Sequence, residues 1–250
     1  MKDVVIVTGA SSGIGAATAR LLGAAGASVV VNYRSSQNLA ENVVADVIAA
    51  GGRSVAIRAD MGQEADIVRL FEETDRAFGP VTGLVNNAGI NGPVLRRLED
   101  YTFKEVMDIL AVNTAGVLIA CREAVSRMST RHGGQGGSIV NVSSIGALTG
   151  SPGRFIHYAG SKGAVDTMTL GIAVEVAREG VRVNAVRPGT VDTPIHDKVG
   201  QRDRVMRSAS DTPLGRAGQP EEVAESIAWL LSDKASLVTG AILNVMGAQR

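Results

Sequence analysis

The stretch Thr8-Gly9-Ala10-Ser11-Ser12-Gly13-Ile14-Gly15 follows the apolar run Val4-Val5-Ile6-Val7 and precedes a helical pattern. Its glycines let the backbone turn tightly and approach a pyrophosphate, and the start of the next helix offers unpaired N–H groups. Three residues separate Gly9 from Gly13, so the spacing is not the common G-x-G-x-x-G. A plain strand-to-helix turn is the alternative. The position directly between a strand and a helix favours a dinucleotide-binding turn.

Outward from this turn, short β-branched runs alternate with longer helical patterns. Strands are expected near residues 3–8, 28–33, 54–58, 81–86, 138–142, 181–186 and 241–245. Helical patterns such as 16–25, 39–50 and 65–78 lie between them, which is the βαβ rhythm of a parallel sheet. The chain is therefore predicted to be α/β, a single doubly wound Rossmann-type domain over 1–250 with a seven-stranded parallel sheet and helices on both faces. Sites in such sheets lie at the carboxyl ends of the strands.

The composition excludes several classes of function. With 25 Lys and Arg against 25 Asp and Glu, the chain has no net charge to attract nucleic acid or an acidic membrane surface. No secretory signal pattern and no apolar run of membrane-spanning length are recognised, so a cytoplasmic location and no membrane partner are expected. Cys121 is the only cysteine, and three histidines are scattered. We therefore predict no intrachain disulfide and no metal site.

Tyr158 and Lys162 are four residues apart and so share one face of a helix. A phenol has a pKa near ~10, and lowering it to about 7 takes roughly 4 kcal/mol. An ammonium ~4 Å away supplies about 4 kcal/mol at an effective dielectric of ~20. The pair can therefore create a base. Taken alone, the pair is more simply a solvated surface pair.

Together, the glycine-rich turn and Tyr158-x-x-x-Lys162 resemble the short-chain dehydrogenase/reductase family, and the resemblance runs essentially from end to end. Two further motifs, Asn86-Asn87-Ala88-Gly89 and Pro188-Gly189-Thr190-Val191-Asp192-Thr193, stand in the expected order after strands. The resemblance implies four catalytic residues, which are Asn113, Ser144, Tyr158 and Lys162. Family members usually have about thirteen residues from this serine to the tyrosine, and Ser144 lies fourteen before Tyr158. Ser144 is therefore assigned, with one inserted residue in 151–155, and Ser143 is the less favoured candidate.

The resemblance also implies a nicotinamide cofactor along the strand ends. Its expected binding residues are Gly9, Ser11, Ser12, Gly13, Ile14, Gly15, Tyr33, Arg34, Ser35, Asp60, Met61, Asn87, Ala88, Gly89, Tyr158, Lys162, Pro188, Gly189, Val191 and Thr193.

The segment after the second predicted strand bears on cofactor choice. An NAD enzyme usually has an acid about twenty residues beyond the glycines, to bind the ribose 2′-hydroxyl. Tyr33 stands there instead, and Arg34 can pair with a 2′-phosphate. NADP(H) is therefore preferred, with NAD possible, although a solvated loop cation is the plainer role for Arg34. Asp60 is expected beside the adenine, as the cap of the next helix, or as both.

The substrate is expected to be a small alcohol or carbonyl compound. The polar segment at about 194–218 is predicted to be a lid, and Gly92, Leu95, Leu148, Ser151 and Arg154 are candidate pocket residues. The chain resembles both sugar dehydrogenases and 3-oxoacyl-acyl-carrier-protein reductases. Val174 stands where those reductases typically have an arginine that docks the carrier, whereas Arg127 and Arg131 remain available for such a patch. A non-catalytic NADP(H)-binding sensor is the rival class.

Two apolar helical patterns bear on assembly. The helix after Tyr158 and the segment 106–125 carry more apolar residues than one sheet face requires. In the family these two helices form a dimer interface, usually within a tetramer. The resemblance therefore implies a homotetramer, and at least a homodimer.

Overall fold

The sheet is continuous and wholly parallel. A computed structural model describes residues 4–92, 95–193 and 212–249. Seven strands follow the order β3-β2-β1-β4-β5-β6-β7. Their bounds are β1 Val4–Val7, β2 Ser28–Tyr33, β3 Arg53–Arg58, β4 Gly83–Asn86, β5 Gly137–Val142, β6 Val181–Pro188 and β7 Ile242–Val245. The strand order reverses between β1 and β4, and such a switch point is where ligands bind in doubly wound sheets. The predicted fold class is confirmed.

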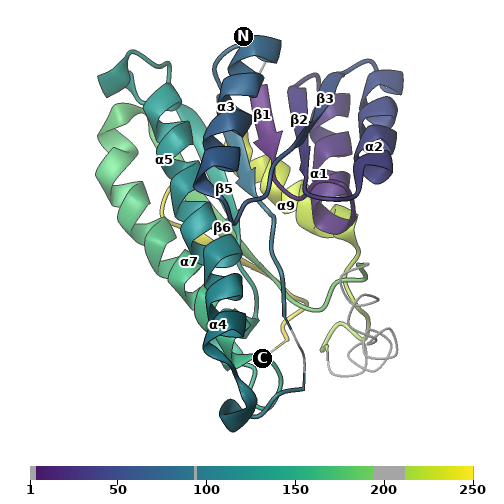
Figure 1. The fold of residues 1–250 in the computed structure, drawn as a ribbon. Coiled ribbons are helices and arrows are strands. Elements are labelled where there is room, and N and C mark those ends of the chain that lie inside the picture. Colours follow the sequence, from purple (N-terminus) through teal and green to yellow (C-terminus); the bar gives the residue numbers. More distant parts are fainter. Residues whose placement is uncertain (1–3, 93–94, 194–211, 250) are drawn as a thin grey trace.

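Helices cover both faces of this sheet (Figure 1). One face is covered by α1 (Gly13–Ala24), α2 (Gln37–Ala49) and α9 (Pro220–Leu231). The other face is covered by α3 (Glu64–Phe78), α5 (Gly116–Met128) and α7 (Ile156–Val176). Shorter elements join them: η1 Leu98–Asp100, α4 Phe103–Leu110, η2 Ala111–Ala115, η3 Thr130–His132, α6 Gly146–Thr149, η4 Ala177–Glu179 and η6 Asp233–Ala235.

The strand sequences explain this layering. In β1, Val5 and Val7 pack on the α1 side while Ile6 packs on the α3 side, and all three are buried. Successive side chains of a strand point to opposite faces, so a strand covered on both faces must be apolar at every position. The continuous apolar runs seen in the sequence are therefore the two-sided core.

The helical stretch Phe103–Met128 corrects one expectation. Its 26 residues have a mean hydropathy of 1.4 in their most apolar window, which is long and apolar enough for a membrane span by length and composition. The expectation that no apolar segment reaches that length is wrong here. However, Ala120, Cys121, Ala124 and Met128 are buried against the sheet. A helix of a globular core passes the same test.

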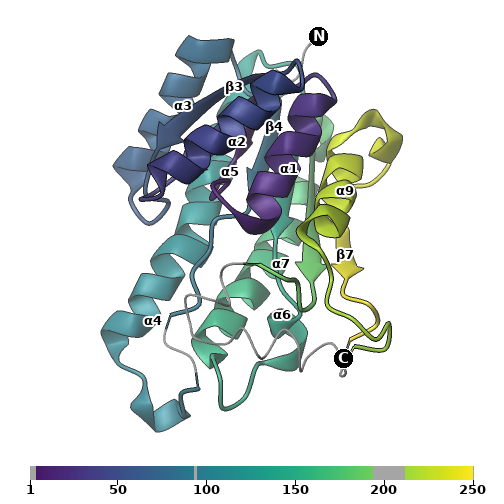
Figure 2. The same cartoon turned by 90° about the vertical axis from the view of Figure 1, so that its right-hand side faces the viewer.

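The predicted lid is described only in part. Residues 194–211 lie outside the described residues, and 212–218 form turns. Within that second part, Gly218 forms a parallel bridge with Val191. Residues 212–218 are therefore attached to the turn that follows β6, at the carboxyl end of the sheet. Figure 2 shows α4, α6 and the start of α7 projecting beyond the sheet at that end.

Candidate active site

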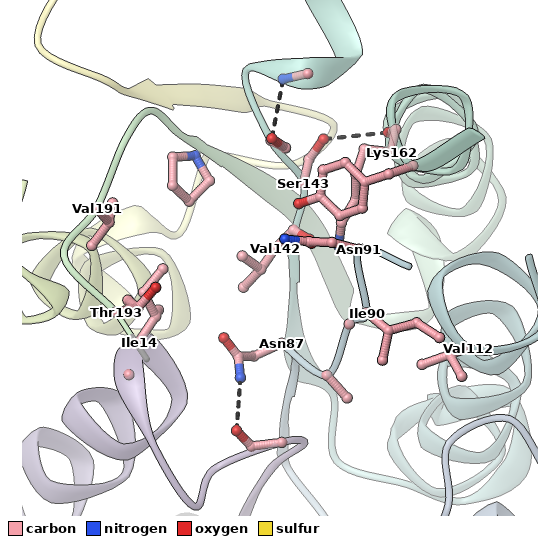
Figure 3. A pocket seen from close by; sticks show the side chains of 18 of the residues that line it. Ile14, Asn87, Ile90, Asn91, Val112, Val142, Ser143, Lys162, Val191 and Thr193 are labelled. Atoms are coloured by element: carbon pink, nitrogen blue, oxygen red, sulfur yellow. Dashed lines mark hydrogen bonds between the residues drawn. The ribbon is translucent and has the colours of Figure 1, made fainter. Parts of the chain in front are cut away.

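A cavity of about 790 Å³ runs along the carboxyl ends of the strands. The glycine-rich turn, Tyr33 and Asp60 line one end, and Ser144 and Tyr158 line the other. Ile14 and Thr193 lie on one side of the pocket, and Lys162 lies on the other (Figure 3). Motifs far apart in the sequence therefore meet in a single space.

The turn before α1 has the geometry of an anion-binding cradle. Gly9 and Gly13 have φ angles of 62° and 57°, in the left-handed region that favours glycine. Ser12 is the N-cap of α1, and its side chain makes no capping hydrogen bond. The first turn of α1 carries no acidic residue that would repel an anion. These features fit the pyrophosphate of a dinucleotide.

Gly15 packs tightly against Asn87 and the backbone of the glycine-rich turn. A Cβ atom on Gly15 would lie 2.5 Å from Asn87 Nδ2 and 2.7 Å from the Gly9 carbonyl oxygen. Asn87 Nδ2 donates hydrogen bonds to the carbonyl oxygens of Thr8 and Gly9, at 2.9 and 3.1 Å. Any larger side chain at position 15 would therefore push Asn87 away from the turn. Gly15 acts through close packing, whereas the neighbouring glycines line the cavity.

Asn32 also holds the turn in place, and the sequence prediction missed it. Its Oδ1 accepts a hydrogen bond from the Gly9 N–H at 3.1 Å. Its Nδ2 donates to the carbonyl oxygens of Ile57 and Ala59, at 3.3 and 3.1 Å. The available signal was a polar residue directly after the apolar run of β2, because a buried asparagine needs partners.

Tyr158 and Ser144 lie together at the other end of the cavity. Tyr158 projects from the first turn of α7, and Ser144 follows β5. Burial raises the pKa of Tyr158, and a hydrogen bond with the Ser144 hydroxyl partly opposes that rise. Ser143 instead donates its hydroxyl to the Lys162 carbonyl oxygen at 3.3 Å, away from Tyr158. The structure therefore pairs Tyr158 with Ser144, the serine favoured from the sequence.

Lys162 lies one helical turn beyond Tyr158 and is buried, with 3% of its surface exposed. Its Nζ donates to the Val142 carbonyl oxygen at 2.7 Å and lies 5.8 Å from the centre of the Tyr158 ring. Burial lowers the pKa of Lys162 to about 8, although Asp166 opposes this. The sequence predicted that a nearby ammonium would lower the pKa of Tyr158. In the protein, burial raises that pKa instead. Desolvation of the phenol outweighs a cation that is itself desolvated.

Asn113 lies in η2, a π-helical turn between α4 and α5. Its Oδ1 accepts from the Ile90 N–H at 2.9 Å. Its Nδ2 donates to the Ile90 carbonyl oxygen at 2.9 Å and to Ser161 Oγ at 3.1 Å. π-turns inside helices occur frequently at functional sites. Asn113 connects this π-turn to α7 through Ser161 and to the cavity wall at Ile90.

At the opposite end, Arg34 and Asp60 lie near each other. Arg34 Nη1 is 4.0 Å from Asp60 Oδ2, and the two side chains are 59% and 34% exposed. An ion pair at this distance and exposure contributes about 0–1 kcal/mol to stability. Arg34 is therefore free to bind another anion. Asp60 Oδ1 accepts from the Gly62 N–H at 2.9 Å, while Gln63 is the N-cap of α3. The alternative that Asp60 caps the next helix is therefore wrong.

The motif after β6 is held by the chain's last residues. Gln249 Oε1 accepts from the Thr190 N–H at 3.0 Å, and Thr190 and Gln249 both line the cavity. The sequence prediction missed Gln249 because no local pattern connects it with a segment 59 residues earlier. Only the packing of β7 beside β6 brings the two together.

Comparisons with known proteins agree with this geometry. The family described as Enoyl-(Acyl carrier protein) reductase matches residues 9–247. The uncharacterized oxidoreductase YgfF of Escherichia coli strain K12 is 45% identical over 98% of this chain and 99% of its own length. The chain belongs to the short-chain dehydrogenase/reductase family. It is thus an NAD(P)-dependent short-chain dehydrogenase/reductase, as the resemblance implied.

Other relatives of this dehydrogenase/reductase carry different activities in their names. The 3beta-hydroxysteroid dehydrogenase 1 of Eggerthella lenta is 39% identical over 97% of this chain and 92% of its own length. The 3-oxoacyl-[acyl-carrier-protein] reductase of a Synechocystis strain is 39% identical over 98% of this chain and 96% of its own length. Equal identity to both leaves the substrate to be argued from the site itself.

Most of the predicted site residues of this dehydrogenase/reductase line the cavity. Gly15 and Asn113 are the two that do not, and both lie directly behind its wall. Of the candidate substrate residues, Ser151 and Arg154 line the cavity, whereas Gly92, Leu95 and Leu148 do not. Asn91, Gly146, Thr149, Pro152 and Phe155 also line it, in the segments 91–97 and 146–157 that were expected to form the pocket walls. The remaining lining residues are Asn32, Ser36, Ala59, Ile90, Val112, Val142, Ser143, Ile145, Thr190 and Gln249.

No group of three or more His, Cys, Asp or Glu side chains with metal-binding geometry occurs within residues 4–92, 95–193 and 212–249. Cys121 is buried beside Asn86 and Asn141, and burial raises its pKa to about 12. Its thiol is therefore protonated at neutral pH and packs in the core.

Proposed function

We propose that this chain is an NADP(H)-preferring oxidoreductase that interconverts a secondary alcohol, or a sugar hydroxyl, with a carbonyl compound. One observation carries the proposal: the side chains of Tyr158 and Ser144 lie together beside Gly146, in the same cavity that the glycine-rich turn lines. A proton carrier and a polar partner are what a carbonyl oxygen requires when it gains or loses a hydride at its carbon.

The nicotinamide, when bound, supplies or accepts the hydride. In the reductive direction, Tyr158 donates its hydroxyl proton to the substrate oxygen, and Ser144 donates a hydrogen bond to the same oxygen. The raised pKa of Tyr158 keeps that proton in place at neutral pH. In the oxidative direction Tyr158 must accept the proton, so alcohol oxidation should become faster as pH rises.

We propose that Lys162 and Asn113, which lie near Gly89, assist this proton transfer. A Cβ atom on Gly89 would lie 3.5 Å from Asn113 Oδ1 and 3.6 Å from Lys162 Nζ. The two polar groups therefore border the same small space beside Gly89. We propose that Lys162 stabilises negative charge on Tyr158 and that Asn113 continues the hydrogen-bonded path.

Arg34 supports the preference for NADP(H). Arg34 lines the cavity and is largely exposed, and among the described residues its ion-pair partner is the Asp60 carboxylate, 4.0 Å away. Arg58 Nε donates to the Arg34 carbonyl oxygen at 3.1 Å, which places a second cation beside that end of the cavity. Two cations and one weakly paired carboxylate favour a 2′-phosphate over a 2′-hydroxyl.

The alternative activity, reduction of 3-oxoacyl groups on an acidic carrier protein, finds less support on the surface. Val174, where those reductases typically carry an arginine, is 82% exposed. Arg127 is bound to Asp75 and Glu123 at 2.8 and 3.0 Å, so its charge is already neutralised. Arg131 is the exposed cation of that proposed patch. The non-catalytic sensor is less favoured still, because all four catalytic residues are retained.

Exposed apolar side chains support assembly into a homotetramer. Leu118 of α5 and Leu170 and Val174 of α7 are exposed on the two helices that form the dimer interface in the family. Trp229 and Leu237 are exposed near β7, and Leu237 is 97% accessible. Such residues occur together where another subunit covers them. Light scattering of the purified protein tests this, and a monomer at micromolar concentration would refute it.

The activity is tested by absorbance of NADPH during incubation with sugars, polyols, oxoacyl thioesters and small ketones, in both directions. We expect turnover of a small carbonyl or hydroxy compound that depends on Tyr158. Turnover of carrier-bound oxoacyl thioesters alone would favour the reductase alternative. Binding of NADPH without turnover of any class would favour the sensor.

A further inference from the structure

The loop between α6 and α7 shapes the substrate end of the cavity. Ser151 has a φ of 48°, an unfavourable angle for a residue with a side chain. A Cβ atom on Gly146 would lie 3.3 Å from Ser151 Oγ, 3.4 Å from Ser144 Oγ and 3.6 Å from Tyr158 Cε1. Ser151 therefore converges with the proposed catalytic pair around Gly146. Strained residues of this kind cluster where a ligand is held.

Arg154 is anchored in the same loop by its backbone. Its N–H donates to the Ser151 carbonyl oxygen at 3.2 Å. Its carbonyl oxygen accepts from the Arg96 N–H at 3.3 Å and from the Tyr101 hydroxyl at 3.5 Å. These bonds fix the main chain from two sides. The side chain of Arg154 remains exposed and lines the cavity.

The guanidinium of Arg154 forms no ion pair with any described carboxylate. Arg96, its neighbour across the loop, is paired with Glu105 at 3.2 Å. Among the described residues that line the cavity, only Arg34, Asp60, Arg154 and Lys162 are charged. Asp60 lies beside Arg34, at the far end. Among the described residues, the end of the cavity that holds Tyr158 and Ser151 is therefore lined by two cations, Arg154 and Lys162, and by no carboxylate.

We propose that Arg154, together with the Ser151 hydroxyl, binds an oxyanion group of the substrate, a carboxylate or a phosphate. A guanidinium presents a planar fork of donors that matches either group, and Ser151 adds one donor beside it. Tyr158 then acts on a carbonyl or hydroxyl elsewhere in the same molecule. This inference rests on the proposed oxidoreductase function and names the substrate class of its site.

The test compares charged and neutral members of matched probe pairs. One pair is 4-oxopentanoate and its methyl ester, and the other is dihydroxyacetone phosphate and dihydroxyacetone. Calorimetry measures their binding to the full-length protein saturated with NADP⁺, which cannot reduce a ketone. We expect the charged member of at least one pair to bind about tenfold more tightly than its neutral partner. The pair that shows the preference distinguishes a carboxylate from a phosphate.

Substitutions then assign the preference to Arg154. Arg154→Ala should remove the advantage of the charged probe and leave the neutral probe unchanged, while Arg154→Lys should retain part of it. Ser151→Ala should reduce it by a smaller factor. Arg178→Ala is the matched control, because Arg178 is exposed in η4, just before β6 begins and away from the carboxyl ends of the strands. It should change neither affinity.

Equal binding of charged and neutral probes in both pairs would overturn the inference. So would an advantage that survives Arg154→Ala. Turnover with NADPH is measured separately on the same probes. If the neutral probes are reduced without any preference for the charged ones, the proposed function stands and the anion site is refuted. If the Arg154-dependent preference is present and no probe is reduced, the anion site stands and reduction of these compounds is refuted.

Discussion

The two ends of the cavity hold their polar groups in opposite ways. At the Tyr158 end, Lys162 and Asn113 are buried and each donates hydrogen bonds to backbone carbonyl oxygens. At the Arg34 end, Arg34 is largely exposed, Asp60 is half-buried, and the two side chains lie 4.0 Å apart. Burial changes the pKa of a group by several units, whereas exposed charges interact weakly through water. The buried end is therefore suited to chemistry and the exposed end to selecting a ligand.

The largest effect is expected at the buried end, from Tyr158→Phe. Loss of the hydroxyl removes the proton carrier, so kcat should fall about 10²–10⁴-fold. The ring remains, so the dissociation constant for NADPH should change little. Steady-state kinetics and fluorescence titration measure the two quantities. Residual activity above about a tenth of the wild type would exclude Tyr158 as the acid/base group.

Lys162→Met should separate activity from stability. The folded chain holds the Lys162 proton with a pKa of about 8, against 10.5 for a free lysine. Between these values the unfolded chain binds more protons, so wild-type stability should rise with pH from about 8 to about 10.5 and then level off. The variant should lack this rise. It should also be about 1–2 kcal/mol more stable at pH 7, because no buried charge remains, while losing activity.

Urea denaturation at pH 7 and pH 9.5 measures that difference. The same slope of stability against pH in both proteins would show that Lys162 is not the group responsible. A variant less stable than wild type at pH 7 would mean that the hydrogen bond to Val142 outweighs the desolvation of the ammonium.

Gly15→Ala tests the turn that lies between the two ends. The new methyl group would clash with Asn87 Nδ2 and with the Gly9 carbonyl oxygen, which should lower the free energy of unfolding by about 1–3 kcal/mol. NADPH binding should weaken as well. Gly160→Ala is the control, because Gly160 is helical, exposed and has nothing within 4 Å of an added Cβ atom. That change should stabilise the chain by about 0.5–1 kcal/mol.

The smallest effect is expected at the exposed end, from Arg34→Ala. Loss of one solvated cation should weaken NADP(H) binding roughly tenfold and leave NAD(H) binding nearly unchanged. The effect should shrink as salt concentration increases, because exposed charges are screened. Parallel titrations with both cofactors provide the control within one experiment. Equal losses for both would contradict a role for Arg34 in binding the 2′-phosphate.

The sequence was sufficient where the determinant is local. Strand positions followed from apolar runs, and all seven strands were located within a few residues of their observed bounds. The choice of Ser144 over Ser143 followed from spacing along one segment, and the structure pairs that serine with Tyr158. Asn32 was missed although it is also local, because a single buried asparagine at a strand end is a weak signal.

Other features of the site depend on segments that meet only in the folded chain. The pKa of Tyr158 was expected to fall because of Lys162, yet burial by surrounding residues raises it. Asp60 was not expected near Arg34, since the two belong to different strand ends. The Arg154 loop is held by Arg96 and Tyr101, more than fifty residues earlier in the chain. None of these contacts has a sequence pattern.

By itself, the sequence determined the parallel sheet, the glycine-rich turn and the candidate reacting side chains, because each depends on residues a few positions apart. Only the tertiary structure decided how those side chains are charged and what else faces them. Charge state depends on desolvation, and desolvation is the sum of contacts from every segment that packs around a group. Arg154 was a candidate pocket residue in the sequence, but only the fold showed which groups line the same cavity with it.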